Sequence, residues 1–144
     1  MSRRGKAIIV DIDGTLAMRT ERGPYDWDRV SEDTPNRPIV EIVNALQVSM
    51  GPTVSVVFVS GRKNVCRMKT LEWLKRFMLN ESPWSLHMRG DTDNREDAVM
   101  KEELYREHIE PEFDVIAVFD DRQQVVDMWR SLGLTVLQVA PGDF

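Results

Sequence analysis

Four polar clusters in this sequence carry side chains that could act together on a phosphate group. They are Asp11-Ile12-Asp13-Gly14-Thr15, Ser60-Gly61-Arg62, Asp97 with Lys101, and Asp120-Asp121-Arg122. The aspartates of the first and last clusters would repel one another at close range, so they need a compensating cation. Magnesium prefers oxygen ligands and combines a few carboxylates with water and a substrate phosphate. The clusters therefore predict metal-assisted phosphoryl transfer.

Asp97 and Lys101 stand four residues apart, so a helix would place them on one face. As an isolated surface ion pair they would contribute only about 0.3–0.5 kcal/mol to stability. Because the other three clusters are present, we favour a functional interpretation. In that interpretation Lys101 contacts the phosphate, and Asp97 orients Lys101.

The elements that must position these clusters alternate between strands and helices. Strands are expected at residues 6–11, 53–60, 85–89, 113–120 and 134–139, and helices at 38–50, 65–78, 94–108 and 125–132. Nearly continuous apolar strands are typical of a parallel sheet that is covered on both faces. The pattern predicts a three-layer, Rossmann-like α/β fold with about five parallel strands and helices on both faces. Ligands bind at the carboxyl ends of such strands, where three of the four clusters lie.

A polar loop spans residues 14–36 and is long for a small domain, which favours a functional role. Within it, Tyr25 and Trp27 either stack on a terminal nucleobase or pack beneath the loop, and the sequence does not decide between these alternatives. No segment between Thr15 and Lys101 is long enough for a separate cap domain. We therefore expect one domain, residues 1–144, with no large cap and an open site.

Composition excludes several classes of protein. The chain has 144 residues, of which 42% are hydrophobic and 30% charged, as in ordinary globular proteins. Its net charge of −5 argues against nonspecific coating of nucleic acid. The longest apolar run has five residues, 115–119, whereas a membrane span needs about 20. Because the chain has no apolar signal segment and Cys66 is its only cysteine, we expect no disulfide and a reducing cytoplasm.

Other conspicuous residues have simpler interpretations. Residues 61–79 hold six Lys or Arg and one acid, which taken alone indicates a solvated helix face. His87 and His108 are isolated in the sequence and are expected to be structural. The cations Arg3, Arg4 and Lys6 are expected to form a solvated terminus.

The ordered clusters resemble the motifs of the haloacid dehalogenase superfamily. In that superfamily, Asp-x-Asp-x-Thr follows the first strand, a Ser or Thr ends the next, a Lys or Arg lies on a later helix, and an acidic pair follows. Here these motifs fall on Asp11 to Thr15, Ser60, Lys101 and the pair Asp120-Asp121.

Longer stretches resemble the 3′-phosphatase domain of phage-type polynucleotide kinase-phosphatases. They are residues 22–26, 59–62, 118–122, 125–130 and 142–144. The chain lacks the Gly-x-x-x-x-Gly-Lys-Ser/Thr loop of the kinase, so no kinase activity is expected from it.

This resemblance implies a nucleophile, an acid–base group and a metal site. Asp11 would attack phosphorus and form an aspartyl-phosphate. Asp13 would protonate the leaving ribose 3′-oxygen and then deprotonate the attacking water. Mg²⁺ would be held by Asp11, the backbone carbonyl of Asp13, and the pair Asp120 and Asp121.

The resemblance also implies which groups bind the phosphate. Ser60 and Lys101 would hold its oxygens, and Asp97 would orient Lys101. Arg62 and Arg22 would add charge-assisted donors to the phosphate or its neighbour.

The leading hypothesis is a Mg²⁺-dependent phosphatase that acts on the 3′-phosphate end of DNA or RNA. We expect a separate or fused kinase or ligase as its partner and no association with a membrane. A second hypothesis keeps the chemistry but takes a small phosphate ester such as a nucleotide. A third is a phospho-acceptor domain without turnover, like receiver domains. In those domains, however, the adjacent acidic pair comes early, whereas here it comes late.

Overall fold

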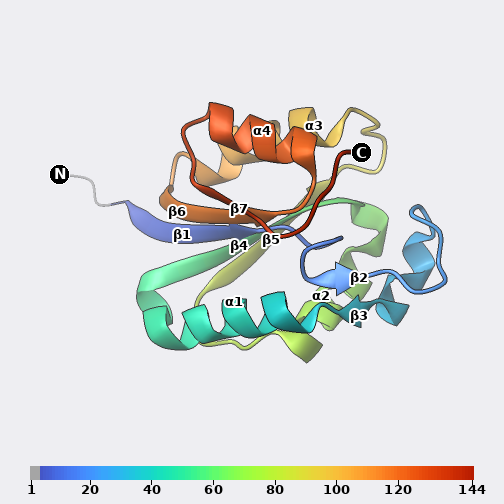
Figure 1. Ribbon diagram of the computed structural model, residues 1–144, viewed down its shortest axis with the longest axis horizontal. Helices are drawn as coiled ribbons and strands as arrows, with labels where there is room; N and C mark the ends of the chain where they lie inside the picture. Colours follow the sequence, from blue (N-terminus) through green and yellow to red (C-terminus); the bar gives the residue numbers. More distant parts are fainter. Residues whose placement is uncertain (1–3) are drawn as a thin grey trace.

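The computed structural model describes residues 4–144 and has the predicted α/β architecture (Figure 1). Five parallel strands form one sheet in the order β5-β4-β1-β6-β7. The strands are β1 Gly5–Val10, β4 Val54–Lys63, β5 Trp84–Arg89, β6 Phe113–Asp120 and β7 Val136–Gln138. Helices α1 and α2 cover one face, and α3 and α4 cover the other (Figure 1).

Alternation along the central strand divides the core in two. On β1, Ile8 and Val10 face the first core, which lies beneath α1 and α2. Ala7 and Ile9 face the second core, which contains Trp129 of α4. All four strand residues are at most 2% exposed, as expected of a parallel strand that is buried on both faces.

The helices are α1 Arg37–Met50, α2 Arg67–Phe77, α3 Asp97–Leu104 and α4 Gln123–Ser131, and Tyr105–Ile109 continue α3 as a π-helical turn. The third helix begins at Asp97, later than predicted. Asn94, where the predicted helix begins, lies outside the observed one and accepts a hydrogen bond from Lys63 Nζ at 2.9 Å. On α2 the buried residues are Thr70, Trp73 and Leu74, whereas the apolar Met68 is exposed. Burying the large indole of Trp73 fixes this rotation of the helix.

The polar loop folds into a small flap (residues 14–36). Its strands β2 Ala17–Met18 and β3 Thr34–Pro35 pair in antiparallel fashion, and the 3₁₀ helix η1 Trp27–Glu32 lies between them. Trp27 packs against the first core, while Tyr25 is 79% exposed. Packing is thus observed for Trp27, and Tyr25 projects into solvent.

Within residues 4–144, no helix is long and apolar enough to cross a membrane. Arg3 lies outside the described residues, and Lys6 is exposed. Arg4 is not simply solvated, because its Nε lies 2.8 Å from Asp114 Oδ1.

Candidate active site

Asp11 follows the central strand and lies in a buried ion-pair network. Lys101 Nζ from α3 is 2.8 Å from Asp11 Oδ1 and 3.2 Å from Asp120 Oδ2. Thr15 Oγ1 donates to the other Asp11 oxygen at 3.0 Å. Burial, reinforced by the charge of Asp120, raises the pKa of Asp11 despite the opposing Lys101. Burial disfavours the charge of Lys101 as well, but Asp11 and Asp120 outweigh it and raise the pKa of Lys101.

Asp11, Asp120 and Asp121 form an acidic cluster suited to a divalent cation. Each offers a carboxylate oxygen, and these oxygens lie within 4.8 Å of one another. Lys101 alone cannot neutralise three buried carboxylates, so the donor set fits Mg²⁺. Gly14 has φ +82°, and a Cβ there would lie 2.1 Å from Asp121 Oδ2, so glycine is required for this close approach. Burial raises the pKa of Asp121, as expected for an uncompensated carboxylate.

The Asp13 side chain lies apart from this cluster and pairs with two arginines. Arg62 Nε and Nη2 donate to Asp13 Oδ2 and Oδ1 at 3.0 and 2.9 Å, and Arg22 Nη2 donates to Oδ1 at 3.2 Å. The Asp13 side chain is 38% exposed, while both arginines are buried. Asp13 therefore stands at the solvent-facing mouth of the site, so a metal contact from it would have to come from the backbone, as the resemblance implies.

Asp33 is a member of this network that the sequence did not reveal. Its two oxygens accept from Arg22 Nε at 2.7 Å, from Arg22 Nη2 at 2.9 Å and from Arg62 Nη2 at 2.7 Å. Its side chain is fully buried. Trp73 Nε1 donates to the Asp33 carbonyl at 2.9 Å, and Thr70 Oγ1 accepts from Arg62 Nη1 at 3.1 Å. These bonds join the flap, β4 and α2 into one rigid wall of the site.

Ser60 on β4 and Asp97 on α3 are the remaining predicted site residues. Ser60 is buried near the end of β4, which continues to Lys63, past the predicted end at residue 60, and its Oγ accepts from the Arg62 amide at 3.1 Å. Asp97 accepts from Arg122 Nη1 at 2.8 Å and from Arg89, a second residue that sequence reasoning missed. Among the described residues, Asp97 makes neither a hydrogen bond nor an ion pair with Lys101. Two guanidiniums satisfy Asp97 while Lys101 turns to Asp11 and Asp120, so Asp97 acts on Lys101 only through its charge.

Comparisons with known proteins identify the family of the chain. The family model of the polynucleotide kinase PNKP phosphatase domain matches residues 5–144. A protein of Autographa californica nuclear polyhedrosis virus, named as a bifunctional polynucleotide kinase/RNA ligase, is 36% identical over 136 residues. That alignment covers 93% of this chain and 19% of the viral protein.

Solved structures extend the comparison to the fold. A chain in the structure of the Pnkp1/Rnl/Hen1 complex has a TM-score of 0.88 and 36% identity, covering 100% of this chain and 49% of that one. A chain of the Pnkp1/Rnl/Hen1 RNA repair complex has a TM-score of 0.88 and 37% identity, covering 98% and 44%. The HAD domain of the Legionella pneumophila effector Lem4 shares the fold alone, at 15% identity and a TM-score of 0.57.

This chain thus spans less than half of the first two solved chains and about a fifth of the viral protein. Its match to the family model nevertheless covers nearly its whole length. The chain belongs to the haloacid dehalogenase-type phosphatase domains of polynucleotide kinase and is a phosphomonoester hydrolase domain.

Proposed function

We propose that this chain is a Mg²⁺-dependent polynucleotide 3′-phosphatase that works through an aspartyl-phosphate on Asp11. The observation that carries the proposal is the position of Asp11. It contacts the buried cation of Lys101 and belongs to the acidic cluster suited to Mg²⁺, and a second carboxylate, Asp13, stands at the mouth of the site. One carboxylate is thus placed to attack phosphorus and the other to exchange protons with solvent or the leaving group.

In the proposed reaction, Asp11 attacks phosphorus and the ribose 3′-oxygen leaves with a proton from Asp13. Water, deprotonated by Asp13, then hydrolyses the aspartyl-phosphate. Ser60 and Lys101 bind the phosphate oxygens. Bound Mg²⁺, held by Asp11, Asp120, Asp121 and the Asp13 carbonyl, supplies electrostatic stabilisation of the developing negative charge.

Arg22 and Arg62 also control when the Asp13 carboxyl is free to act. Without substrate, both arginines donate hydrogen bonds to the Asp13 carboxylate. An incoming phosphate competes with that carboxylate for Arg22 and Arg62. Substrate binding would therefore release the Asp13 carboxyl to serve the leaving oxygen. The Arg22 and Arg62 side chains stay in place during this exchange, because Asp33 continues to hold both of them.

The polynucleotide substrate is supported by the family and by the open mouth of the site. The described residues form no separate cap domain over the strand ends, so a macromolecular end has access. Relatives whose names combine kinase with ligase, or that occur in an RNA repair complex, support a fused or separate kinase or ligase as partner. The viral relative supports action in the cytoplasm of a host cell.

The test compares phosphate release from one DNA and one RNA oligonucleotide, phosphorylated at either the 3′ or the 5′ end, with release from 3′-mononucleotides. We expect Mg²⁺-dependent release from 3′ ends only. Asp11→Asn should abolish both release and a hydroxylamine-sensitive phosphoenzyme. Turnover of mononucleotides alone would instead favour the small-ester alternative, and full activity of Asp11→Asn would contradict the mechanism.

A further inference from the structure

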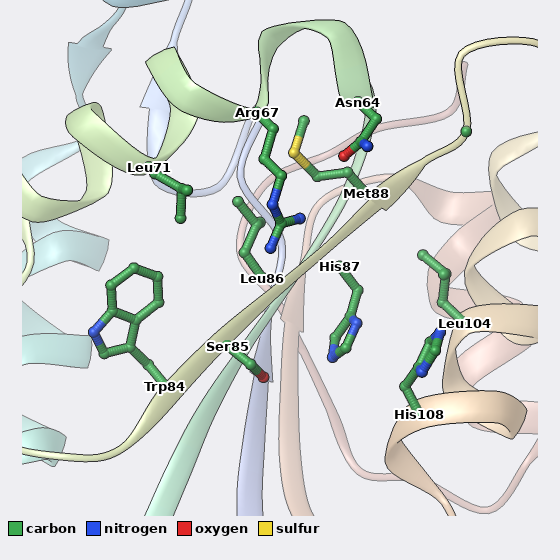
Figure 2. A pocket seen from close by; sticks show the side chains of 11 residues that line it. Asn64, Arg67, Leu71, Trp84, Ser85, Leu86, His87, Met88, Leu104 and His108 are labelled. Carbon is green, nitrogen blue, oxygen red and sulfur yellow. The ribbon is translucent and has the colours of Figure 1, made fainter.

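A second concave surface lies beside the active site, along the outer edge of β5. We call it the β5 groove and define it by Arg67, Leu71, Trp84, His87, Leu104 and His108. It has a cavity volume of about 560 Å³. Within residues 4–144, β5 pairs only with β4, so its other edge is open. Figure 2 shows Arg67 and Leu71 on one side of β5 and Leu104 and His108 on the other.

The β5 groove offers aromatic faces. The rings of His87 and His108 stack in parallel, with centroids 4.8 Å apart and planes 8° from parallel, although the sequence suggested two isolated histidines. Burial, followed by the charges of His108 and Arg67, lowers the pKa of His87, while Glu112 opposes this shift. At neutral pH the His87 ring is therefore an uncharged platform. Trp84 adds a partly exposed indole (Figure 2).

Positive charge lies at one end of the β5 groove and negative charge lies beyond the other. Arg67 has no acidic partner within 4 Å in the part of the chain that the structure describes, and the segment 61–79 carries six cations against one acid. Glu107 and Glu112 line a neighbouring hollow that adjoins the groove at Trp84, His87 and His108. The flap, the other route away from the site, has five acids and three cations in residues 19–33. A polyanion is therefore favoured at the Arg67 end of the β5 groove and disfavoured on the flap.

The cationic end of the β5 groove is also the end near the site. In the sheet register, Met88 of β5 pairs with Ser60 of β4, one strand spacing of about 4.8 Å away. Asn64, at the upper end of the groove, follows Arg62 by two residues. A strand whose terminal phosphate lies at Ser60 can thus reach the groove within its next few nucleotides.

We propose that the β5 groove binds the nucleotides immediately upstream of the 3′-terminal phosphate of a single-stranded polynucleotide. Arg67 contacts a backbone phosphate, and a base stacks on the aromatic side chains, because single strands are bound by such combinations of cation and aromatic platform. This inference rests on the proposed function and adds to it a substrate-length dependence that the catalytic centre alone does not give.

The test uses Arg67→Glu and, as matched control, Arg130→Glu. Both arginines are without an acidic partner among the described residues, but Arg130 lies on α4, over the opposite face of the sheet. Arg67 is the first residue of α2, where a glutamate suits the helix dipole, so the fold is expected to persist. A second variant, His87→Ala with His108→Ala, removes the stacked rings.

The measured quantity is the kcat/KM ratio of a 3′-phosphorylated hexanucleotide to a 3′-mononucleotide. We expect Arg67→Glu and the double histidine variant each to lower this ratio about 10-fold. Arg130→Glu should leave the ratio unchanged, and the rate on the mononucleotide should stay within about 2-fold in every variant. Affinity for a hexanucleotide with a 3′-hydroxyl, which is not turned over, can be measured by fluorescence anisotropy. It should rank the variants in the same order as the kcat/KM ratio.

Four outcomes would overturn the proposal. An unchanged ratio in Arg67→Glu refutes the groove while leaving the proposed function intact. If the ratio falls in Tyr25→Ala instead, the strand lies over the flap. If the protein is a dimer that Arg67→Glu dissociates, the groove binds a second copy of the chain. Absence of release from any 3′-phosphorylated oligonucleotide, with turnover of mononucleotides, refutes both the proposed function and the groove.

Discussion

Replacing Asp33 with asparagine tests whether the buried arginine network supports the site. Asp33 accepts three hydrogen bonds from Arg22 and Arg62, and together with Asp13 it balances their two charges. The variant keeps the shape of the side chain but leaves the network with one uncompensated positive charge. It also places an amide N–H₂ against a guanidinium, so at least one of the three bonds is lost.

The magnitude follows from the burial. Removing one partner of a buried ion pair costs about 3–5 kcal/mol. Asp13 remains bonded to both arginines, so we expect the lower end, about 3 kcal/mol. With an m-value of about 2 kcal/mol per molar urea, the unfolding midpoint falls by about 1.5 M. A domain of ordinary stability, about 5–15 kcal/mol, stays folded after this loss.

The assay combines urea unfolding with steady-state kinetics. In Asp33→Asn the arginines are less well positioned, and a misplacement of about 1 Å can lower activity about 100-fold, so kcat/KM should fall on polynucleotide and mononucleotide alike. Asp28→Asn, on the exposed surface of the same flap, is the control and should match the wild type in both measurements. An Asp33→Asn protein with wild-type stability and kinetics would refute the argument that Asp33 holds the arginines.

Three further predictions concern the metal cluster and the groups around it. Gly14→Ala should raise the Mg²⁺ concentration needed for half-maximal activity at least 10-fold, because its Cβ would lie 2.1 Å from Asp121 Oδ2; an unchanged Mg²⁺ titration would contradict this. Lys101→Met should abolish activity and lower the unfolding free energy by about 3 kcal/mol, measured in urea, because it removes the cation between two buried carboxylates. Burial alone would raise the pKa of Asp97, but the charge of Lys101 and the hydrogen bond from Arg122 outweigh burial. The folded-state pKa of Asp97 therefore lies below the ordinary value of about 3.9. Ionised Asp97 therefore stabilises the fold above that pH, and the stability difference between wild type and Asp97→Asn should shrink as the pH is lowered through about 4 in acid unfolding.

The sequence was most informative where chemistry and periodicity coincide. Asp11, Ser60 and Asp120 lie at or near the carboxyl ends of apolar strands, and parallel strands bring such ends to one edge, so the fold class and this part of the site follow from pattern alone. Lys101 was placed by its distance from Asp97 along a helix. Both lie in the site, although Asp97 pairs with arginines instead of Lys101.

The remaining features depend on tertiary contacts that leave no local pattern. Asp33 stands in a polar loop among other acids, and only its burial against Arg22 and Arg62 distinguishes it. The rotation of α2 depends on how Trp73 fits the first core, which periodicity does not encode. His87 and His108 are 21 residues apart, on a strand and a π-helical turn, and meet only because the sheet edge and that turn pack together.

The two indole donors near the site have a spectroscopic consequence. Trp73 Nε1 donates to the Asp33 carbonyl, and Trp129 Nε1 donates to Asp120 Oδ2 at 3.3 Å. One indole therefore borders the arginine wall, and the other borders the acidic cluster. Variants that retain a single tryptophan would report these two halves separately through their emission. Mg²⁺ titrations would be followed by Trp129 and phosphate titrations by Trp73, with no label introduced into the protein.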